Sequence, residues 1–318
     1  MDLSAIYHEN IPAFLEEAAR APIMQRLRGV GMNCGCEYTS FPQFSAWQSY
    51  SRFDHSLGAG LITWHFTGDP KQALAALLHD VATPVFSHVV DFLRGDHETQ
   101  ESTEVGTREM ILSSPEICRV CESLGIDPED VTDYHRYPIA DNDSPRLSAD
   151  RLEYTLGNII NFGIGTEKTV KAYYENLVAT EQELVFQDEA LACAFAGDAL
   201  KCSRVYVSDA DRYAMQRLAN LLAEAIGAGV LELGELYLQE ADVLQKLENS
   251  RFCGDWQRFR AISKVVRTDR GGLVISAKKR YINPLTPSGK RASQLDPVFA
   301  RDLADFLAWD FGYGVTEG

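Results

Sequence analysis

The sequence predicts a mainly α-helical protein: a helical bundle over residues 1–228, followed by a small α+β region over residues 229–318. Apolar residues recur at helical spacing through most of the first range, which favours helices that bury one face. The pattern changes at residues 227–229, where two glycines flank an alanine and shorter, strand-like clusters begin. The sequence shows no internal repeats or low-complexity linkers, so we expect one large domain with an appendage.

Composition is typical of a soluble globular chain. The 318 residues are enough to bury a sizeable core, with 45% hydrophobic and 24% charged residues. We find no run of about 18 apolar residues that could span a bilayer, and no basic segment followed by an apolar core that would indicate a signal peptide. Seven cysteines, an odd number, favour a reducing compartment. We therefore expect a cytoplasmic protein with no membrane partner.

The formal net charge of -16 argues against a long nucleic acid as partner, because such binding depends on many cations that neutralise phosphates. A small phosphorylated ligand is still permitted, since a few local arginines can dominate the field inside a screened pocket.

Two close cysteine pairs, Cys34-x-Cys36 and Cys118-x-x-Cys121, could together form a four-thiolate zinc site. Cys118 belongs to a helical pattern, however, and small buried thiols are the simpler interpretation.

Helical spacing, with proline or glycine near the ends, predicts the elements of the first half of the chain. Pro12 suits a first helical turn, a second segment follows Pro22, and residues 31–51, rich in glycine, serine and aromatics, form an irregular loop. Gly68-Asp69-Pro70 separates two further helices. The helical segments are expected at 11–30, 54–68, 70–79, 85–94, 98–113, 115–124 and 127–135.

Residues 138–146 contain two prolines and form a loop before the next helices. Helices follow at 148–161, 166–177, 188–206 and 209–227. Residues 177–178 and 184–186 could form a short hairpin. Beyond residue 229 we expect short helices over 231–262, strand-like segments at 264–267, 272–275 and 280–284, and a final helix at 296–309.

Residues 75–91 concentrate side chains that can bind a metal ion. An Ala/Leu-rich run leads into His79 and Asp80, and His88 and Asp91 follow a proline-containing break. Adjacent residues diverge by about 100° on a helix, so His79 and Asp80 need other segments to complete a coordination shell.

His55 and Asp150 are the candidates that would complete this shell. Two imidazoles and two carboxylates suit Mn, Mg, Fe, Ni or Zn, and an ion held there would lower the pKa of a water molecule. Each residue also has a structural interpretation: a His-Asp dipeptide is common, His55 could cap a helix, and Asp150 could be an N-terminal helix acid.

Five blocks, in order, resemble the HD-domain phosphohydrolases, and most closely the dNTP triphosphohydrolases that include the SAM-and-HD-domain type. The resemblance covers about residues 20–225 and implies a metal-binding helical bundle. Gln25-Arg-Leu-Arg28, Tyr38 and Phe41-Pro42 are similar to that branch's upstream segment. The blocks are Arg52-Phe-Asp-His55-Ser-Leu-Gly58, His79-Asp80, Phe86-Ser87-His88 with Asp91, His97-Glu98, and Asp150-Arg151-x-x-Tyr154.

The resemblance implies a role for each matched residue. The metal ligands would be His55, His79, Asp80 and Asp150. Arg52 and Arg151 would hold phosphate oxygens, which suits the forked donors of arginine. Tyr154 would reach the substrate from one turn beyond Asp150, and Gln25 and Tyr206 would contact its sugar or base.

For proton transfer we expect His97 assisted by Asp91, because a carboxylate can orient an imidazole and keep it cationic. His88 has three open interpretations: it orients the metal ligands, it joins His97 at a second metal ion, or it is a buried histidine bonded to a backbone carbonyl. Because relatives in the family assemble as oligomers, the resemblance also implies a homo-oligomer.

Four departures from the family pattern bear on the substrate. Thr83 stands where the triphosphohydrolases have a catalytic histidine, Asn158 replaces an acid that bonds the deoxyribose, and Ser208 replaces a phosphate-binding histidine. The loop between residues 42 and 52 is also longer. These changes leave the metal ligands intact but remove parts of the dNTP-cleaving site.

Basic residues cluster only at Lys278-Lys-Arg280 and Lys290-Arg291 in this acidic sequence. They are expected either on a solvated face or in contact with an acidic partner subunit or a second anionic ligand.

The sequence therefore predicts a metal-dependent phosphohydrolase that acts on a small phosphorylated substrate, foremost a nucleotide. Two alternatives stay open: a nucleotide-binding regulator with weak or lost catalysis, and a hydrolase of a nucleotide second messenger.

Overall fold

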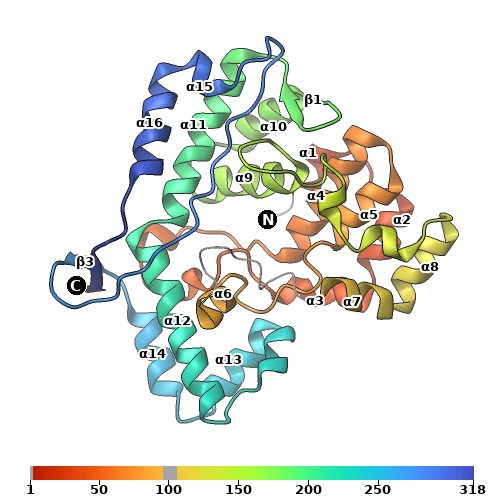
Figure 1. Cartoon of the computed structure of the whole chain (residues 1–318). Coiled ribbons are helices and arrows are strands. Elements are labelled where there is room, and N and C mark those ends of the chain that lie inside the picture. The colour runs from red at the N-terminus through yellow and green to blue at the C-terminus, as the bar shows by residue number, and fades with distance from the viewer. Residues whose placement is uncertain (1–2, 96–105) are drawn as a thin grey trace.

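The computed structural model describes residues 3–95 and 106–318, and it is mainly α-helical, as predicted (Figure 1). The N-terminal prediction at 11–30 resolves into separate helices. Ahead of Pro22, the chain breaks at Arg20 and Ala21, consistent with the restriction that proline places on the residue before it. The N-terminal helices are α1 (Ser4–Tyr7), α2 (Ala13–Ala19) and α3 (Pro22–Arg26).

Two helices with strong end signals follow the irregular loop. Helix α4 (Arg52–Thr67) begins with a capping box: the Ser51 side chain accepts from the Asp54 N–H, and the Asp54 carboxylate accepts from the Ser51 N–H. It ends at Gly68, whose φ of 62° is left-handed. Helix α5 (Pro70–Leu78) then begins with proline in its first turn, behind an Asp69 cap.

The middle of the chain contains shorter helices than the sequence suggests. The structure shows α6 (Val89–Arg94), α7 (Thr107–Ser113) and α8 (Pro115–Ser123). The first part of the helix predicted at 98–113 lies outside the described residues. The helix predicted at 127–135 is wrong: two separate 3-10 turns, Pro128–Val131 and Tyr134–Arg136, occupy that span.

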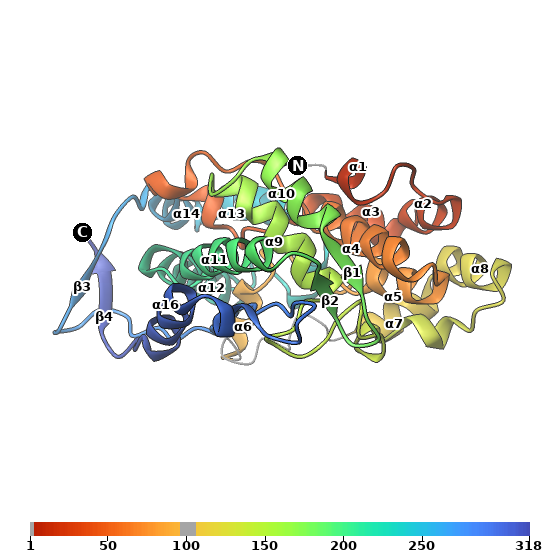
Figure 2. The ribbon, with the colours of Figure 1, turned by 90° about the horizontal axis from the view of Figure 1, so that it is seen from above.

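The next helices and the hairpin match the prediction. Strands β1 (Leu177–Ala179) and β2 (Leu184–Phe186) pair antiparallel, with Val178 opposite Val185. The helices of this part are α9 (Ala149–Asn161), α10 (Glu167–Glu175), α11 (Glu189–Tyr206) and α12 (Asp209–Gly227). Helix α4 packs against both its neighbour in sequence, α5, and the distant helix α9 (Figures 1 and 2), so the three helices meet at one place.

The C-terminal part differs from the prediction in its strands. Strand β3 (Val265–Thr268) pairs antiparallel with β4 (Gly314–Glu317). The strand predicted at 272–275 is wrong, since it makes only an isolated bridge through Leu273, and the one at 280–284 forms no strand. The backbone of 272–284 bonds other elements instead. The helices of the C-terminal part are the 3-10 helix Leu233–Tyr237, α13 (Glu240–Glu248), α14 (Cys253–Ala261), α15 (Ala292–Leu295) and α16 (Pro297–Ala308).

One large apolar core runs through most of the described chain. It includes residues on both sides of position 229, among them Trp256, Ile275 and Val315, together with Leu61 of α4 and Leu77 of α5. A smaller cluster packs α16 against α11. The large core therefore crosses the boundary predicted at residue 228. The division of the chain into two domains at that residue stays a prediction. Among the described residues, no helix is both long and apolar enough to span a membrane.

Candidate metal centre

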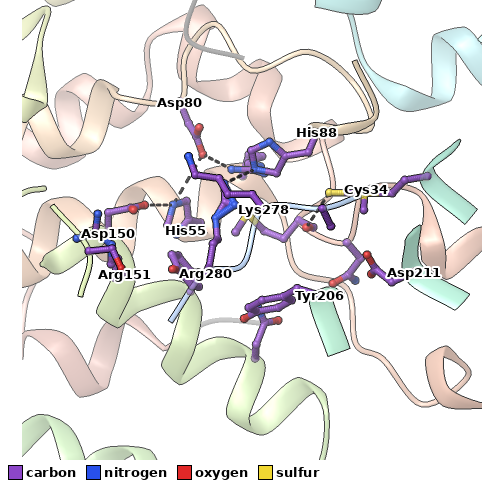
Figure 3. A pocket seen from close by; sticks show the side chains of 18 of the residues that line it. Cys34, His55, Asp80, His88, Asp150, Arg151, Tyr206, Asp211, Lys278 and Arg280 are labelled. Carbon is purple, nitrogen blue, oxygen red and sulfur yellow. Dashed lines mark hydrogen bonds and ion pairs between the residues drawn. The ribbon is translucent and has the colours of Figure 1, made fainter. Parts of the chain in front are cut away.

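The four predicted metal ligands meet where α4, α5 and α9 converge. His55 projects from the first turns of α4, His79 caps α5, Asp80 follows in the next turn, and Asp150 lies in the first turn of α9. Donor atoms of His55, His79 and Asp80 lie within 4.8 Å of one another. Asp150 Oδ1 is 3.1 Å from His55 Nε2 and 3.5 Å from His79 Nε2 (Figure 3).

Hydrogen bonds behind the two imidazoles determine which nitrogen faces the cluster. His55 Nδ1 lies 2.6 Å from Glu153 Oε2, and His79 Nδ1 lies 2.7 Å from the Ala76 carbonyl oxygen. Both partners are acceptors, so each Nδ1 carries a proton and each Nε2 is turned toward the cluster. The two Nε2 atoms are 3.2 Å apart, close enough for a proton to be shared between them. A metal ion would take the place of that proton, because both nitrogens point at the same space.

Asp80 is held as a carboxylate by neighbours on both of its oxygens. Arg52 Nη1 lies 2.9 Å from Oδ2, and the Thr83 hydroxyl donates to Oδ1 at 2.6 Å. Burial would raise the pKa of Asp80, but the charge of Arg52, followed by those of His79 and His55, holds this pKa well below its usual range. Thr83, found where the resembling family has a histidine, therefore orients the carboxylate of a predicted metal ligand.

The cluster attracts positive charge even without an ion. Burial lowers the pKa of His55, but hydrogen bonds to Asp150 and Glu153 outweigh burial and raise this pKa to about 10. For Asp150, burial opposes ionisation, yet contact with His55 keeps its pKa below the usual range. The carboxylates therefore favour a cation at neutral pH, and this mixed nitrogen and oxygen donor set suits a divalent metal.

Glu153 belongs to the site although the sequence analysis did not select it. Its side chain is 2% exposed and also accepts hydrogen bonds from the hydroxyls of Tyr50 and Tyr7. A signal was present: Glu153 lies three residues after Asp150 on one helix, so the two share a face. Gly58 leaves room for Glu153, because a Cβ at Gly58 would lie 2.5 Å from Glu153 Cγ.

The two arginines assigned to phosphate both line the pocket, but each is bonded to the protein. Arg52 also donates to the Ser87 hydroxyl at 3.0 Å. Arg151 donates to Asn142 Oδ1 at 2.7 Å and lies 3.4 Å from Asp141. The two arginines therefore hold Asp80 and Asp141 in place and are also candidate phosphate ligands.

A cavity of about 310 Å³ opens beside the metal ligands. Tyr154 and Tyr206 line it, as predicted, with ring centroids 6.3 Å apart. Trp47 and Phe162 stack at 4.8 Å on the same wall. The side-chain amide of Asn158 donates to the Tyr206 hydroxyl at 2.9 Å. Its side-chain oxygen, Oδ1, is buried without a partner among the described residues.

His88 and Asp91 form a pair at the edge of the cavity. His88 Nδ1 lies 2.8 Å from Asp91 Oδ2, and Asp91 is fully buried. Burial lowers the pKa of His88 to about 4, so its ring is neutral at physiological pH. His97, the predicted proton donor, lies outside the described residues. The structure does not bring Gln25 to the cavity: its side chain donates to the Ala19 carbonyl at 2.7 Å.

The cavity has one wall that the sequence analysis did not foresee. Residues 277–281, from the C-terminal region, line it next to the metal ligands. Arg280 Nη2 lies 3.5 Å from His88 Nε2. Only the positive charge of Lys278-Lys-Arg280 hinted at a role, because sequence spacing carries no information on a contact across almost 200 residues.

Comparison of the sequence with known proteins gives two relatives that cover most of both chains. The uncharacterised protein YdhJ of Bacillus subtilis is 25% identical over 256 residues, which is 79% of this chain and 76% of YdhJ. The Cordyceps militaris protein cns2, named a metal-dependent phosphohydrolase, is 26% identical over 259 residues, or 78% of this chain and 70% of cns2. No family model matches the sequence.

Solved structures share the fold at lower identity. A phosphohydrolase from Bacteroides thetaiotaomicron superimposes with a TM-score of 0.65 at 16% identity, covering 96% of each chain. A hypothetical protein from Aquifex aeolicus superimposes with a TM-score of 0.62 at 19% identity, covering 91% of this chain and 89% of the other. The chain thus has the fold of these proteins and is similar in sequence to a metal-dependent phosphohydrolase.

Proposed function

We propose that the protein is a metal-dependent phosphohydrolase of the HD type that acts on a small phosphorylated metabolite, with a nucleotide as substrate. The observation that carries this proposal is the convergence of His55 Nε2 and His79 Nε2, 3.2 Å apart, on a space that is flanked by the carboxylates of Asp80 and Asp150. The similarity to cns2 supports the same chemistry.

Different residues of the site would bind the metal ion and form hydrogen bonds in the cavity. His55, His79, Asp80 and Asp150 would hold the ion. When bound, a divalent ion supplies Lewis acidity and lowers the pKa of a water molecule. The neutral ring of His88 is held by Asp91 through Nδ1, so its Nε2 can accept a hydrogen bond from a water molecule or a substrate hydroxyl in the cavity.

A nucleotide fits the opposite wall of the cavity. Trp47, Phe162 and Tyr206 offer flat aromatic faces on which a base or a sugar can pack. The buried side-chain oxygen of Asn158, Oδ1, offers an acceptor to a hydroxyl or amino group of the substrate. A cavity of about 310 Å³ lies at the small end of ligand pockets, which reach roughly 1,000 Å³. It therefore suits a small metabolite.

Replacing His79 or Asp80 with Ala tests the metal centre. Both variants should lose the metal, measured by elemental analysis, and with it hydrolysis. His8→Ala serves as the control, because His8 contacts Asn10 outside the cavity and should not affect either property. Turnover by His79→Ala at wild-type metal occupancy would contradict the proposal.

The second candidate is a nucleotide-binding regulator, favoured by Thr83 in place of a histidine. A screen of nucleoside mono-, di- and triphosphates and cyclic dinucleotides, with Mn and Mg compared, separates the two functions. Turnover of any of these supports the enzyme, and the substrate cleaved distinguishes metabolic from second-messenger hydrolysis. Tight binding without turnover under both metals supports the regulator.

A further inference from the structure

The segment from Ser276 to Asn283 runs between β3 and α15 and presents its side chains in alternation. Figure 1 shows this part of the chain crossing the molecule from the β3 end to α15. Ala277 and Tyr281 pack against the apolar cluster beneath α16. Lys279 donates to the Leu307 carbonyl at 2.6 Å, at the C-terminal end of α16, where a cation is favoured.

The two residues between these anchors point the other way. Figure 3 shows the side chains of Lys278 and Arg280 reaching into the cavity, toward the space between His55, Asp80 and His88. This alternation matches what an extended backbone produces, with every second side chain on one face. Lys279 therefore faces α16, while its two basic neighbours face the metal centre.

Backbone contacts hold this segment against the start of α9. The Asn283 N–H donates to the Pro145 carbonyl at 2.9 Å, and the Ser144 hydroxyl donates to the Tyr281 carbonyl at 3.1 Å. The buried guanidinium of Arg212 donates to the Ile275 carbonyl. Since Ser144 and Pro145 lie just before the helix that carries Asp150, the segment is positioned relative to the metal ligands themselves.

The charge of the cavity is distributed in a way that suits a bound anion. Asp80, Asp141 and Asp150 lie on the side of α5 and α9, where Arg52 and Arg151 already contact two of them. The C-terminal segment adds two more cations to the same cavity. A phosphate group that contacts a metal ion on one side then meets Lys278 and Arg280 on the other.

We propose that Lys278 and Arg280 form an anion-binding subsite that holds phosphate oxygens of the substrate. The inference rests on the proposed function, because it assigns the substrate's phosphate to this cavity. Arginine offers two parallel donors to a phosphate, and lysine a compact charge beside them. The C-terminal region is then part of the active site and determines affinity for phosphorylated ligands.

Binding of inorganic phosphate to the full-length, Mn-loaded protein tests this proposal by calorimetry, without any need for turnover. Lys278→Gln and Arg280→Gln should each weaken phosphate binding about tenfold or more, the loss expected for a charge-assisted hydrogen bond. Mn content should not change. Lys290→Gln is the matched control: it removes the same charge from an exposed position of the C-terminal region that does not line the cavity, and it should bind phosphate like the wild type.

Arg280→Lys tests whether misfolding explains a loss of phosphate binding, because this variant keeps the positive charge and loses only the two parallel donors of the guanidinium group. It should bind phosphate with an affinity between those of wild type and Arg280→Gln. Wild-type phosphate affinity in both Lys278→Gln and Arg280→Gln, equal losses in Lys290→Gln, or a wild type that binds no phosphate would each overturn the subsite. Selective loss of phosphate binding with no hydrolysis of any compound would uphold the subsite and refute the phosphohydrolase.

Discussion

Glu153 determines how His55 meets a metal ion. By accepting from Nδ1 at 2.6 Å it keeps the proton on that nitrogen and turns Nε2 toward Asp150. The hydroxyls of Tyr50 and Tyr7 also contact this carboxylate, so its position is determined from several directions. A carboxylate behind a histidine ligand also makes the imidazole a stronger base.

We predict that Glu153→Gln keeps the fold but weakens metal binding. The amide can still accept from the His55 ring but no longer carries a charge. Loss of such a carboxylate partner typically costs ten- to a hundredfold in metal affinity, about 1.4 to 3 kcal/mol. Calorimetric titration with Mn measures the change. Exposed Glu167 on α10 supplies the control, Glu167→Gln, and equal affinities in the two variants would show that Glu153 does not act on the metal.

Asp211 gives stability a pH dependence with a definite sign. Its side chain is 8% exposed, and burial raises its pKa from 3.8 to about 8. Between these values the unfolded chain releases the proton while the folded chain keeps it. The free energy of unfolding attributable to Asp211 is therefore greatest below pH 3.8 and falls as the pH rises toward 8, by about 1.4 kcal/mol per pH unit.

Asp211→Asn removes this proton, so the variant should be more stable than the wild type, and by a margin that grows from pH 5 to pH 8. Urea unfolding of the metal-free proteins at pH 5, 6, 7 and 8 measures the margin. Asp269→Asn, at an exposed position, should leave the slope unchanged. A margin that is constant across this range would contradict the assignment.

The site residues that could be predicted from the sequence were those whose residue type and neighbours already indicate metal binding. His79 and Asp80 are adjacent metal-binding types, and His55 and Asp150 were added by their order in a resembling pattern. Glu153 was missed because an acid on a helix is ordinarily exposed. Lys278 and Arg280 were assigned to a solvated face, an acidic partner subunit or a second anionic ligand. Their place in this cavity was not predicted, because it depends on how the chain returns across α9 and α11. Gln25 matched the pattern but does not reach the cavity.

Close packing of α4 on α9 is what brings His55 and Asp150 together. Gly58 faces Glu153, and Gly157 on α9 faces Tyr50, whose hydroxyl oxygen would lie 2.7 Å from a Cβ there. Helix α4 therefore approaches α9 at Gly58, and the segment just before α4 approaches α9 at Gly157, both positions without a side chain. A larger residue at either place must push a buried polar group out of its hydrogen bonds.

Gly58→Ala should lower both stability and metal affinity. The new Cβ would lie 2.5 Å from Glu153 Cγ, so the carboxylate or the helix must shift, at a cost of about 1–3 kcal/mol. Gly197→Ala is the matched control, because Gly197 lies within α11 with nothing within 4 Å of its Cβ position. Alanine there should stabilise by up to about 1 kcal/mol. Thermal melts compare the two, and equal shifts would contradict the packing argument.

Elements with end signals were predictable and those without were not. A capping box and Gly68 mark the ends of α4, Asp69 and Pro70 mark the start of α5, and the hairpin from β1 to β2 follows from two short apolar runs. The segments at 272–275 and 280–284 have strand-like residues but form no strand, and only Leu273 makes a single bridge to Val315 of β4. Their backbone groups bond Pro145, Val315 and the Arg212 side chain instead, which no local pattern specifies.

At the scale of the whole molecule, the C-terminal region is joined to the helical bundle twice. Its apolar residues enter the large core, and its basic segment lines the cavity beside the metal ligands. The net charge of -16 argued against a long nucleic acid as partner but said nothing of this local concentration of cations. The mainly α-helical class was predictable from periodicity, because most helices bury one face in a common core.

The metal dependence of hydrolysis by the intact protein tests the central claim most directly. Protein stripped with a chelator and dialysed is assayed against the nucleotide panel, before and after divalent ions are restored, with metal content measured in the same samples. The site predicts no turnover in the stripped protein and recovery in proportion to bound metal, up to the occupancy that the four ligands support. Full turnover in protein that contains no metal would contradict it.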